Sequence, residues 1–229
     1  MSFATIAILG IITIFSLWKA LPEGTVGQRP NVKAELQVLT RKPVLLALLT
    51  TVLSSGAMFT LYTYIAPMLQ NITHASPMFI TGMLVLIGIG FSIGNHLGGK
   101  FADRSLTKTL TGFLILILVM MLIFPILAQT QIGAATALVI WGTATFAVVP
   151  PLQMRVMSVA HEASGLASSV NIGAFNLGNA LGAAAGGAVL SLGMSYAAVS
   201  MVGAFLAALG LVLVFIQMKM NHSEALKVV

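Results

Sequence analysis

The chain contains no cysteine, and only 7% of its 229 residues are charged. The absence of cysteine excludes disulfide bonds and thiolate metal sites. A soluble domain has about 25% charged residues. This chain is 58% hydrophobic, and a soluble fold could not cover so much apolar surface. The composition therefore indicates an integral membrane protein.

Acidic residues are scarce as well: the chain has five Asp and Glu and eleven Lys and Arg. An excess of basic residues can indicate a nucleic-acid partner, but in membrane proteins it reflects Lys and Arg in the cytoplasmic loops. We therefore expect the lipid bilayer, and no nucleic acid, as a partner. The HExxH motif is absent and no Asp or Glu lies within an uncharged segment, which argues against an enzyme within the membrane. We expect no metal site and no cofactor.

Four long segments carry no charged residue: 1–18, 44–99, 109–154 and 163–218. The first fits one spanning helix of about 20 residues, and each of the others fits two. Turn-forming residues interrupt each of the three longer segments. Strands of a membrane barrel would alternate polar and apolar residues, which these segments do not do. The sequence predicts an all-α membrane protein with seven spans, at residues 2–18, 44–66, 78–99, 109–128, 132–154, 164–190 and 195–217.

The eleven basic residues all fall on alternate connections between these spans. By the positive-inside rule that side is cytoplasmic, which places the C-terminus in the cytoplasm and the N-terminus outside. Residues 1–21 lack the basic start and cleavage site of a signal peptide, so we interpret them as an internal helix. Residues 22–43 are expected to be a cytoplasmic linker, 44–217 a six-helix bundle that could divide as three plus three, and 218–229 a tail.

The stretch Gly99-Lys100-Phe101-Ala102-Asp103-Arg104 lies between the third and fourth predicted spans. It resembles the cytoplasmic loop motif of the major facilitator superfamily: Gly, three residues, Asp, a basic residue, any residue, Gly, then two basic residues. Leu106 and Thr107 depart from that motif. The position of the match implies helix six, the central loop and helices seven to twelve of a twelve-helix transporter.

Three further stretches are similar to the bacterial drug- and sugar-efflux branch of that family: "TLYTYIAPMLQ", "ATFAVVPPLQMRVM" and "SSVNIGAFNLGNALGAAAGGAVL". The resemblance implies secondary active, proton-coupled efflux of small organic solutes such as drugs or sugars across the bacterial inner membrane. Transport would occur by alternating access, and the chain's partner would be an N-terminal six-helix half. The alternative is a non-transporting fragment of a truncated transporter gene.

The resemblance also implies a gating loop formed by Gly99, Asp103 and Arg104. The Asp103 carboxylate would meet the positive N-terminal end of a neighbouring helix while the cytoplasmic ends are together. A solvated turn is the alternative interpretation of this loop. We further expect Gly98 and Gly99 to end the third span tightly.

The sixth predicted span, 164–190, carries small residues at every fourth position. Gly178, Gly182 and Gly186 at this spacing favour close helix packing in lipid. Asn171 and Asn176 lie in the same span. An amide there either bonds to another helix or faces a wet cavity, so both are candidates for the substrate cavity.

Four other candidates come from the second and fifth spans, which the family architecture places around the cavity. Met58 and Tyr62 are four residues apart in the second span, and Trp141 and Thr145 are four apart in the fifth. We also expect Pro150-Pro151 to distort the fifth span. Arg155 is expected to mark its cytoplasmic end.

Overall fold

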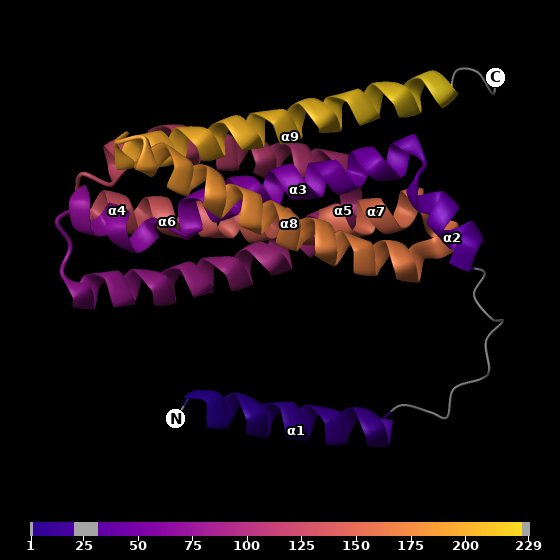
Figure 1. The fold of residues 1–229 in the computed structure, drawn as a ribbon, viewed down its shortest axis with the longest axis horizontal. Helices are drawn as coiled ribbons and strands as arrows, with labels where there is room; N and C mark the ends of the chain where they lie inside the picture. The colour runs from indigo at the N-terminus through magenta and orange to yellow at the C-terminus, as the bar shows by residue number, and fades with distance from the viewer. Residues whose placement is uncertain (1, 21–31, 226–229) are drawn as a thin grey trace. The chain divides into compact units, whose positions relative to one another are not determined.

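The computed structural model describes residues 2–20 and 32–225, which form helices joined by short turns (Figure 1). The chain divides into two compact units, Met1–Lys33 and Ala34–Val229. The first unit contains α1 (Ser2–Ala20). Its described side chains are exposed, including Trp18 beside Lys19. Its apolar stretch Ala7–Ala20 is shorter than the helices of spanning length.

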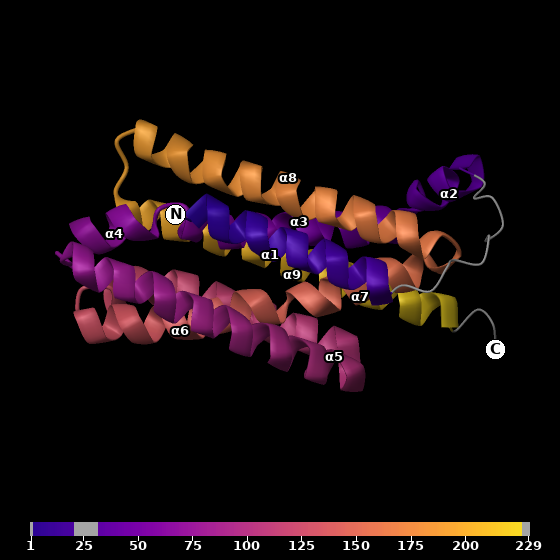
Figure 2. The ribbon, with the colours of Figure 1, turned by 90° about the horizontal axis from the view of Figure 1, so that it is seen from below.

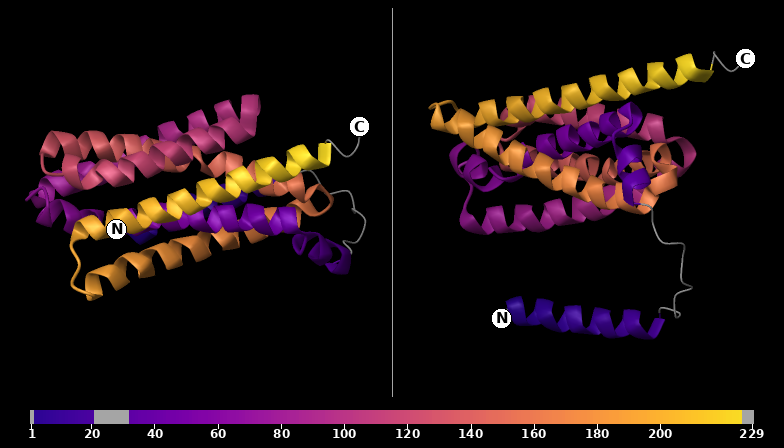
Figure 3. Two further views of the ribbon diagram at one scale, coloured as in Figure 1. Left: turned by 90° about the horizontal axis from the view of Figure 1, so that it is seen from above. Right: turned by 45° about the vertical axis from the view of Figure 1, so that its right-hand side comes forward.

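The long helices of the remaining chain lie along one another as a bundle (Figures 2 and 3). In the part of the chain that the structure describes there is no strand, so the all-α prediction is confirmed. The elements are α2 (Val32–Leu39), α3 (Lys42–Tyr62), α4 (Ile65–Asn71), α5 (Pro77–Leu127), α6 (Gln131–Ala147), α7 (Val149–Val159), the 3-10 turn η1 (His161–Ala163), α8 (Ser164–Ser191) and α9 (Tyr196–Ala225).

Four helical segments among the described residues are long and apolar enough to cross a membrane: Lys42–Tyr62, Pro77–Leu127, Gln131–Val159 and Tyr196–Met220. α5 has 51 residues, a length that fits two crossings. α8 has 28 residues, but its serines, asparagines and glycines make it less apolar. The count of seven crossings therefore stays a prediction.

α5 folds back on itself at Ser105, the one residue inside it with non-helical backbone angles (φ −163°, ψ 97°). The aromatic rings of Phe101 and Phe113 stack across this bend with centroids 6.3 Å apart. The helix runs without interruption through Gly98 and Gly99 to the bend, so the prediction that these glycines end a span was wrong. Gly98 instead lies against α6, where a β-carbon would overlap the Ala147 backbone.

Two helix pairs pack closely through glycines spaced four residues apart. On α8, a β-carbon at Gly182 would overlap the Gly56 carbonyl of α3. On α5, a β-carbon at Gly94 would overlap the Thr143 carbonyl of α6. α3 and α5 contain the first three predicted spans of the bundle, and α6 to α9 contain the last three. α3 of the first set therefore packs on α8 of the second, and α6 of the second set packs on α5 of the first. This reciprocal packing is what a division into three plus three helices would produce.

The two prolines predicted to distort the fifth span lie at a helix break. α6 ends at Ala147 and α7 begins at Val149. Pro150 and Pro151 have no amide hydrogen, so they cannot donate to the carbonyls one turn earlier. Arg155 lies inside α7, which continues to Val159, so the prediction that Arg155 marks the helix end was wrong. It is only 6% exposed, and its Nε donates a 2.5 Å hydrogen bond to Gln217 Oε1 of α9.

The predicted linker 22–43 is partly helical, since α2 and the first residues of α3 belong to it. Residues 21–31 lie outside the described part. Val38 of α2 is buried with α3, α7 and α8 in a small apolar cluster: Val38, Val44, Ala47, Val156, Ala160, Ala163 and Ala167. Residues 218–225 of the predicted tail continue α9, and 226–229 are not described.

Candidate functional site

A cavity of about 260 Å³ lies between α3, α6, α7 and α8. No charged residue is among those that line it. Its walls combine apolar and aromatic side chains with three amides and one hydroxyl, a composition typical of sites for small organic molecules. The lining residues are Thr51, Phe146, Val149, Leu152, Gln153, Asn171, Ile172, Phe175 and Asn176.

A chain of short hydrogen bonds runs along the wall of this cavity. The Thr51 hydroxyl donates to Asn171 Oδ1 at 2.7 Å. Asn171 Nδ2 donates to Gln153 Oε1 at 2.6 Å, and Gln153 Nε2 donates to the Ser168 hydroxyl, also at 2.6 Å. These bonds connect α3, α8 and α7, and their energy is enhanced in apolar surroundings. We refer to Thr51, Asn171, Gln153 and Ser168 as the polar chain.

Asn171 and Asn176, two candidates from the sequence, both line the cavity but differ in their surroundings. Asn171 is 4% exposed and uses its oxygen and nitrogen in the polar chain. Asn176 is exposed, and its Nδ2 donates to the Ile172 carbonyl of its own helix at 3.0 Å. Asn176 is therefore better placed to bind a solute, and Asn171 to hold the wall in position.

The other four cavity candidates lie in or next to the apolar core. Met58 and Trp141 are buried in the core, and the Trp141 ring lies 6.3 Å from Phe91. Thr145 is buried, and its hydroxyl donates to the Trp141 carbonyl at 2.9 Å. Tyr62 is 37% exposed, with its ring 5.8 Å from that of Phe91. None of these four residues lines the 260 Å³ cavity, and two of them, Tyr62 and Trp141, have their rings against Phe91.

The residues of the proposed gating loop lie in the last helical turns before the α5 bend. Asp103 and Arg104 are exposed, and Gly99 is half-buried. Within the described residues, neither Asp103 nor Arg104 forms an ion pair. The loop's charges are thus free to meet another surface.

The three glycines predicted to pack a helix, Gly178, Gly182 and Gly186, are buried along one face of α8. This face meets α3 and Tyr64. Two hydrogen bonds reinforce the contact: the Thr60 hydroxyl donates to the Gly182 carbonyl at 3.1 Å, and the Tyr64 hydroxyl to the Ala183 carbonyl at 2.8 Å. The close contact fixes the helix that carries Asn171 and Asn176.

Gln153 was not predicted as a site residue, although it joins two of the helices around the cavity. The one local feature that could have indicated this role is its position two residues after Pro151. A proline removes a backbone hydrogen bond, so polar groups near it form bonds with other helices. Gln217 was not predicted either; its Nε2 donates to the Leu46 carbonyl at 3.1 Å and to the Thr50 hydroxyl at 2.9 Å. Gln217 thus ties α9 and the buried Arg155 to α3.

An exposed ion pair joins the start of α3 to the α7–α8 turn. Arg41 Nη2 lies 2.6 Å from Glu162 Oε2, and His161 Nε2 lies 3.9 Å from the other carboxylate oxygen. The hydrogen bond from Arg41 lowers the pKa of the Glu162 carboxyl below its ordinary value. Among the described residues, no three His, Cys, Asp or Glu side chains are grouped so as to hold a metal ion.

The sequence and fold both match known transporters. The Major Facilitator Superfamily profile matches residues 1–183. The inner membrane transport protein YdhP of Escherichia coli K12 is 66% identical over 215 residues, covering 94% of this chain and 55% of YdhP. The uncharacterized MFS-type transporter YfhI of Bacillus subtilis is 35% identical over 211 residues, covering 92% and 53%.

The fold matches that of a solved transporter at low sequence identity. The major facilitator transporter FucP, crystallised in its outward conformation, superposes with a TM-score of 0.72 at 15% identity. The match covers 93% of this chain and 53% of FucP. The chain therefore spans about half the length of the transporters it matches.

Proposed function

Since this chain belongs to the Major Facilitator Superfamily, we propose that it forms the C-terminal part of a secondary active transporter of the bacterial inner membrane. It crosses the membrane seven times, with α5 crossing twice, and the basic connections lie in the cytoplasm. An N-terminal six-helix half completes the transporter, and the two halves rock against each other in alternating access. The 66% identity with YdhP carries this proposal.

The 260 Å³ cavity forms this half's wall of the substrate site. Its amides and hydroxyl can exchange hydrogen bonds with a solute, while Phe146 and Phe175 offer apolar contact. With no charged residue in the lining, the site favours small organic solutes such as drugs or sugars over highly charged metabolites. Asn176 is the side chain that binds the solute.

Proton-coupled efflux would need a titratable group on the transport path. Buried ionisable groups are the usual proton carriers in membrane transporters. No Asp or Glu lines the cavity, so the coupling carboxylate belongs to the N-terminal half. Asp103 acts in gating: its exposed carboxylate meets the N-terminal end of a helix of the other half when the cytoplasmic ends close.

The proposal is tested by fusing this chain to the N-terminal half of YdhP. Everted membrane vesicles containing the fusion are energised, and transport of ethidium and of radiolabelled sugars is followed. We expect proton-dependent flux of at least one probe, reduced by Asn176→Leu and unaffected by Leu177→Ile, an exposed position of α8 outside the cavity lining. If YdhP transports a probe that the fusion does not, the chain is a non-transporting fragment.

A further inference from the structure

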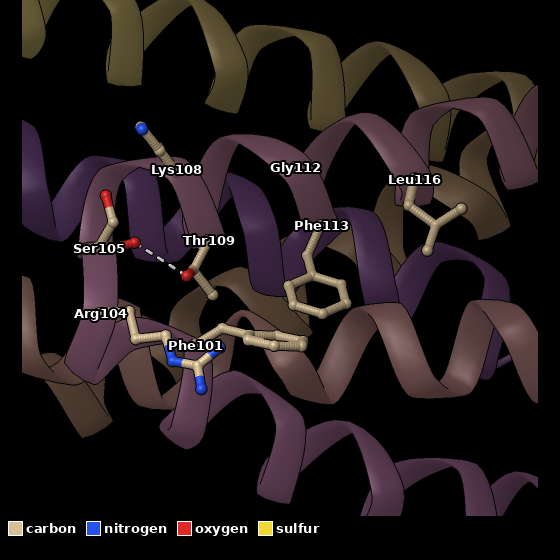
Figure 4. A pocket seen from close by; sticks show the side chains of 8 residues that line it. All are labelled: Phe101, Arg104, Ser105, Lys108, Thr109, Gly112, Phe113 and Leu116. Carbon is tan, nitrogen blue, oxygen red and sulfur yellow. Dashed lines mark hydrogen bonds between the residues drawn. The ribbon is translucent and has the colours of Figure 1, made fainter.

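The bend of α5 encloses a groove that the transport proposal does not use. It has a volume of about 380 Å³ and lies between the two arms of α5, next to Ser105. Phe101 comes from the first arm, and Gly112, Phe113 and Leu116 come from the second (Figure 4). The floor of the groove is therefore apolar and aromatic, and suited to a hydrocarbon chain.

Two cations stand at one end of this apolar groove. Arg104 and Lys108 both line it and are exposed. Figure 4 shows the Arg104 guanidinium beside the Phe101 ring and the Lys108 ammonium pointing outward at the rim. In the part of the chain that the structure describes, neither has an acidic partner. Asp103 is the adjacent acid in sequence, but it does not line the groove.

We propose that this groove binds one anionic phospholipid. The phosphate lies between Arg104 and Lys108, and an acyl chain extends past Gly112 along Phe113 and Leu116. The charge complementarity supports this occupant, because basic pockets between membrane helices at the cytoplasmic side suit acidic headgroups. A free phosphate would not use the apolar floor, and a neutral lipid would not use the two cations.

The position of the groove agrees with a lipid at the membrane boundary. The bend lies where an apolar helix pair ends in charged residues, which is where headgroups meet acyl chains. Long basic side chains reach from such positions to the headgroup region while their methylene stems cover apolar surface. Arg104 and Lys108 are both exposed, so their long side chains can turn toward a phosphate at this end of the groove.

Gly112 offers a variant that fills the groove without disturbing the helix. A β-carbon at Gly112 would meet no atom within 4 Å, so a larger side chain there can enter the groove. Gly88 is also exposed in α5 with no atom within 4 Å of its β-carbon, and it does not line the groove. The pair Gly112→Leu and Gly88→Leu therefore separates loss of the groove from a general effect of leucine on α5.

The test measures lipid binding by the purified full chain in detergent with native mass spectrometry, so it does not depend on transport. Phosphatidylglycerol is titrated against phosphatidylcholine of the same chain length. We expect one saturable phosphatidylglycerol. A basic residue near an anionic headgroup raises the binding constant about fivefold. The double variant Arg104→Gln with Lys108→Gln should therefore bind phosphatidylglycerol about 25-fold more weakly. Lys100→Gln, an exposed cation outside the groove, should leave it unchanged. Gly112→Leu should weaken binding and Gly88→Leu should not.

Three results would overturn the proposal. The first is equal binding of phosphatidylglycerol by the wild type and the double variant, with circular dichroism showing both folded. The second is displacement of the lipid by millimolar inorganic phosphate, which would make a free anion the occupant. The third is equal affinity for phosphatidylcholine, which would make the groove a non-selective lipid contact.

Discussion

Thr51 and Asn171 are 120 residues apart in the sequence, yet the Thr51 hydroxyl donates a 2.7 Å hydrogen bond to Asn171 Oδ1. Asn171 also donates to Gln153. One buried amide therefore connects α3, α7 and α8 at the cavity wall. An unpaired polar group would be costly in such surroundings, so each partner restrains the other.

Removing this amide should destabilise the bundle more than removing its neighbour. Asn171→Ala removes the acceptor of the 2.7 Å bond from Thr51 and the donor to Gln153 Oε1, and we expect a loss of about 1–2 kcal/mol in the free energy of unfolding. Asn176→Ala breaks a bond only within its own helix and should cost less than about 0.5 kcal/mol. Unfolding in mixed micelles with increasing dodecyl sulfate measures both. Equal losses would show that the polar chain does not stabilise the wall.

Gly182→Ala should disrupt the contact between α8 and α3. The added β-carbon would overlap the Gly56 carbonyl, and backbone cannot move aside as a side chain can. We expect the free energy of unfolding to fall by about 1–3 kcal/mol. Gly173→Ala is the matched control, because a β-carbon there meets no atom within 4 Å. The control should be neutral or slightly stabilising, since alanine favours helix. A neutral Gly182→Ala in the same unfolding assay would mean that the helices are further apart.

Gln217→Leu should leave a buried cation without its hydrogen-bond acceptor. The Arg155 Nε loses Gln217 Oε1, and the Leu46 carbonyl loses a donor. We expect a loss of about 1.5–3 kcal/mol, as is typical for a hydrogen bond to a charged group. The exposed Gln70→Leu serves as a control and should change little.

Adding Arg155→Met to Gln217→Leu should restore part of the lost stability, because the unpaired charge is then removed. The same unfolding assay on all variants gives the coupling energy of the pair. A double variant less stable than Gln217→Leu alone would contradict this explanation.

The Arg41–Glu162 ion pair should make stability depend on pH in the acid range. Its hydrogen bond lowers the pKa of Glu162 from 4.5. The pair therefore stabilises the folded state above that value, and the contribution is lost as the pH falls through the lowered pKa. The groups are exposed, so added salt should weaken the effect.

Thermal unfolding from pH 6 to pH 3 measures this effect, with Arg41→Gln as the test variant. The wild type should lose more stability than Arg41→Gln below pH 4.5, and the two curves should converge at high salt. Parallel curves at low salt would show that the ion pair does not contribute.

Much of the fold follows from the sequence because lipid imposes strong constraints. Long uncharged segments must be helices, since backbone groups in lipid have no water to bond. The double proline requires a break, and the structure has one before Pro150. Gly98 shows the limit: a glycine near charged residues suggests a helix end, whereas here it permits close approach of Ala147. Only the tertiary neighbour distinguishes these roles.

The cavity was only partly predictable from the sequence. Asn171 and Asn176 stood out because amides are uncommon in apolar helices. Trp141 was a candidate because the family architecture places its span around the cavity, but the structure buries it beside Phe91. Gln153 and Thr51 could not be found, because their roles depend on partners in other helices. Polarity marks the residues that need partners, and the packing decides which partners they find.

Single-cysteine labelling most directly tests the central claim that α5 crosses the membrane twice and the basic connections are cytoplasmic. The chain has no native cysteine, so each introduced cysteine reports its own position. The variants expected outside the cell are Asn71→Cys, Gln131→Cys and Leu192→Cys. Those expected in the cytoplasm are Ser105→Cys and His161→Cys. Leu192 is preferred to Gly193, whose φ of 76° disfavours a side chain. In intact cells, a membrane-impermeant maleimide should label the first three and neither of the last two. External labelling of Ser105→Cys would contradict the placement of the bundle.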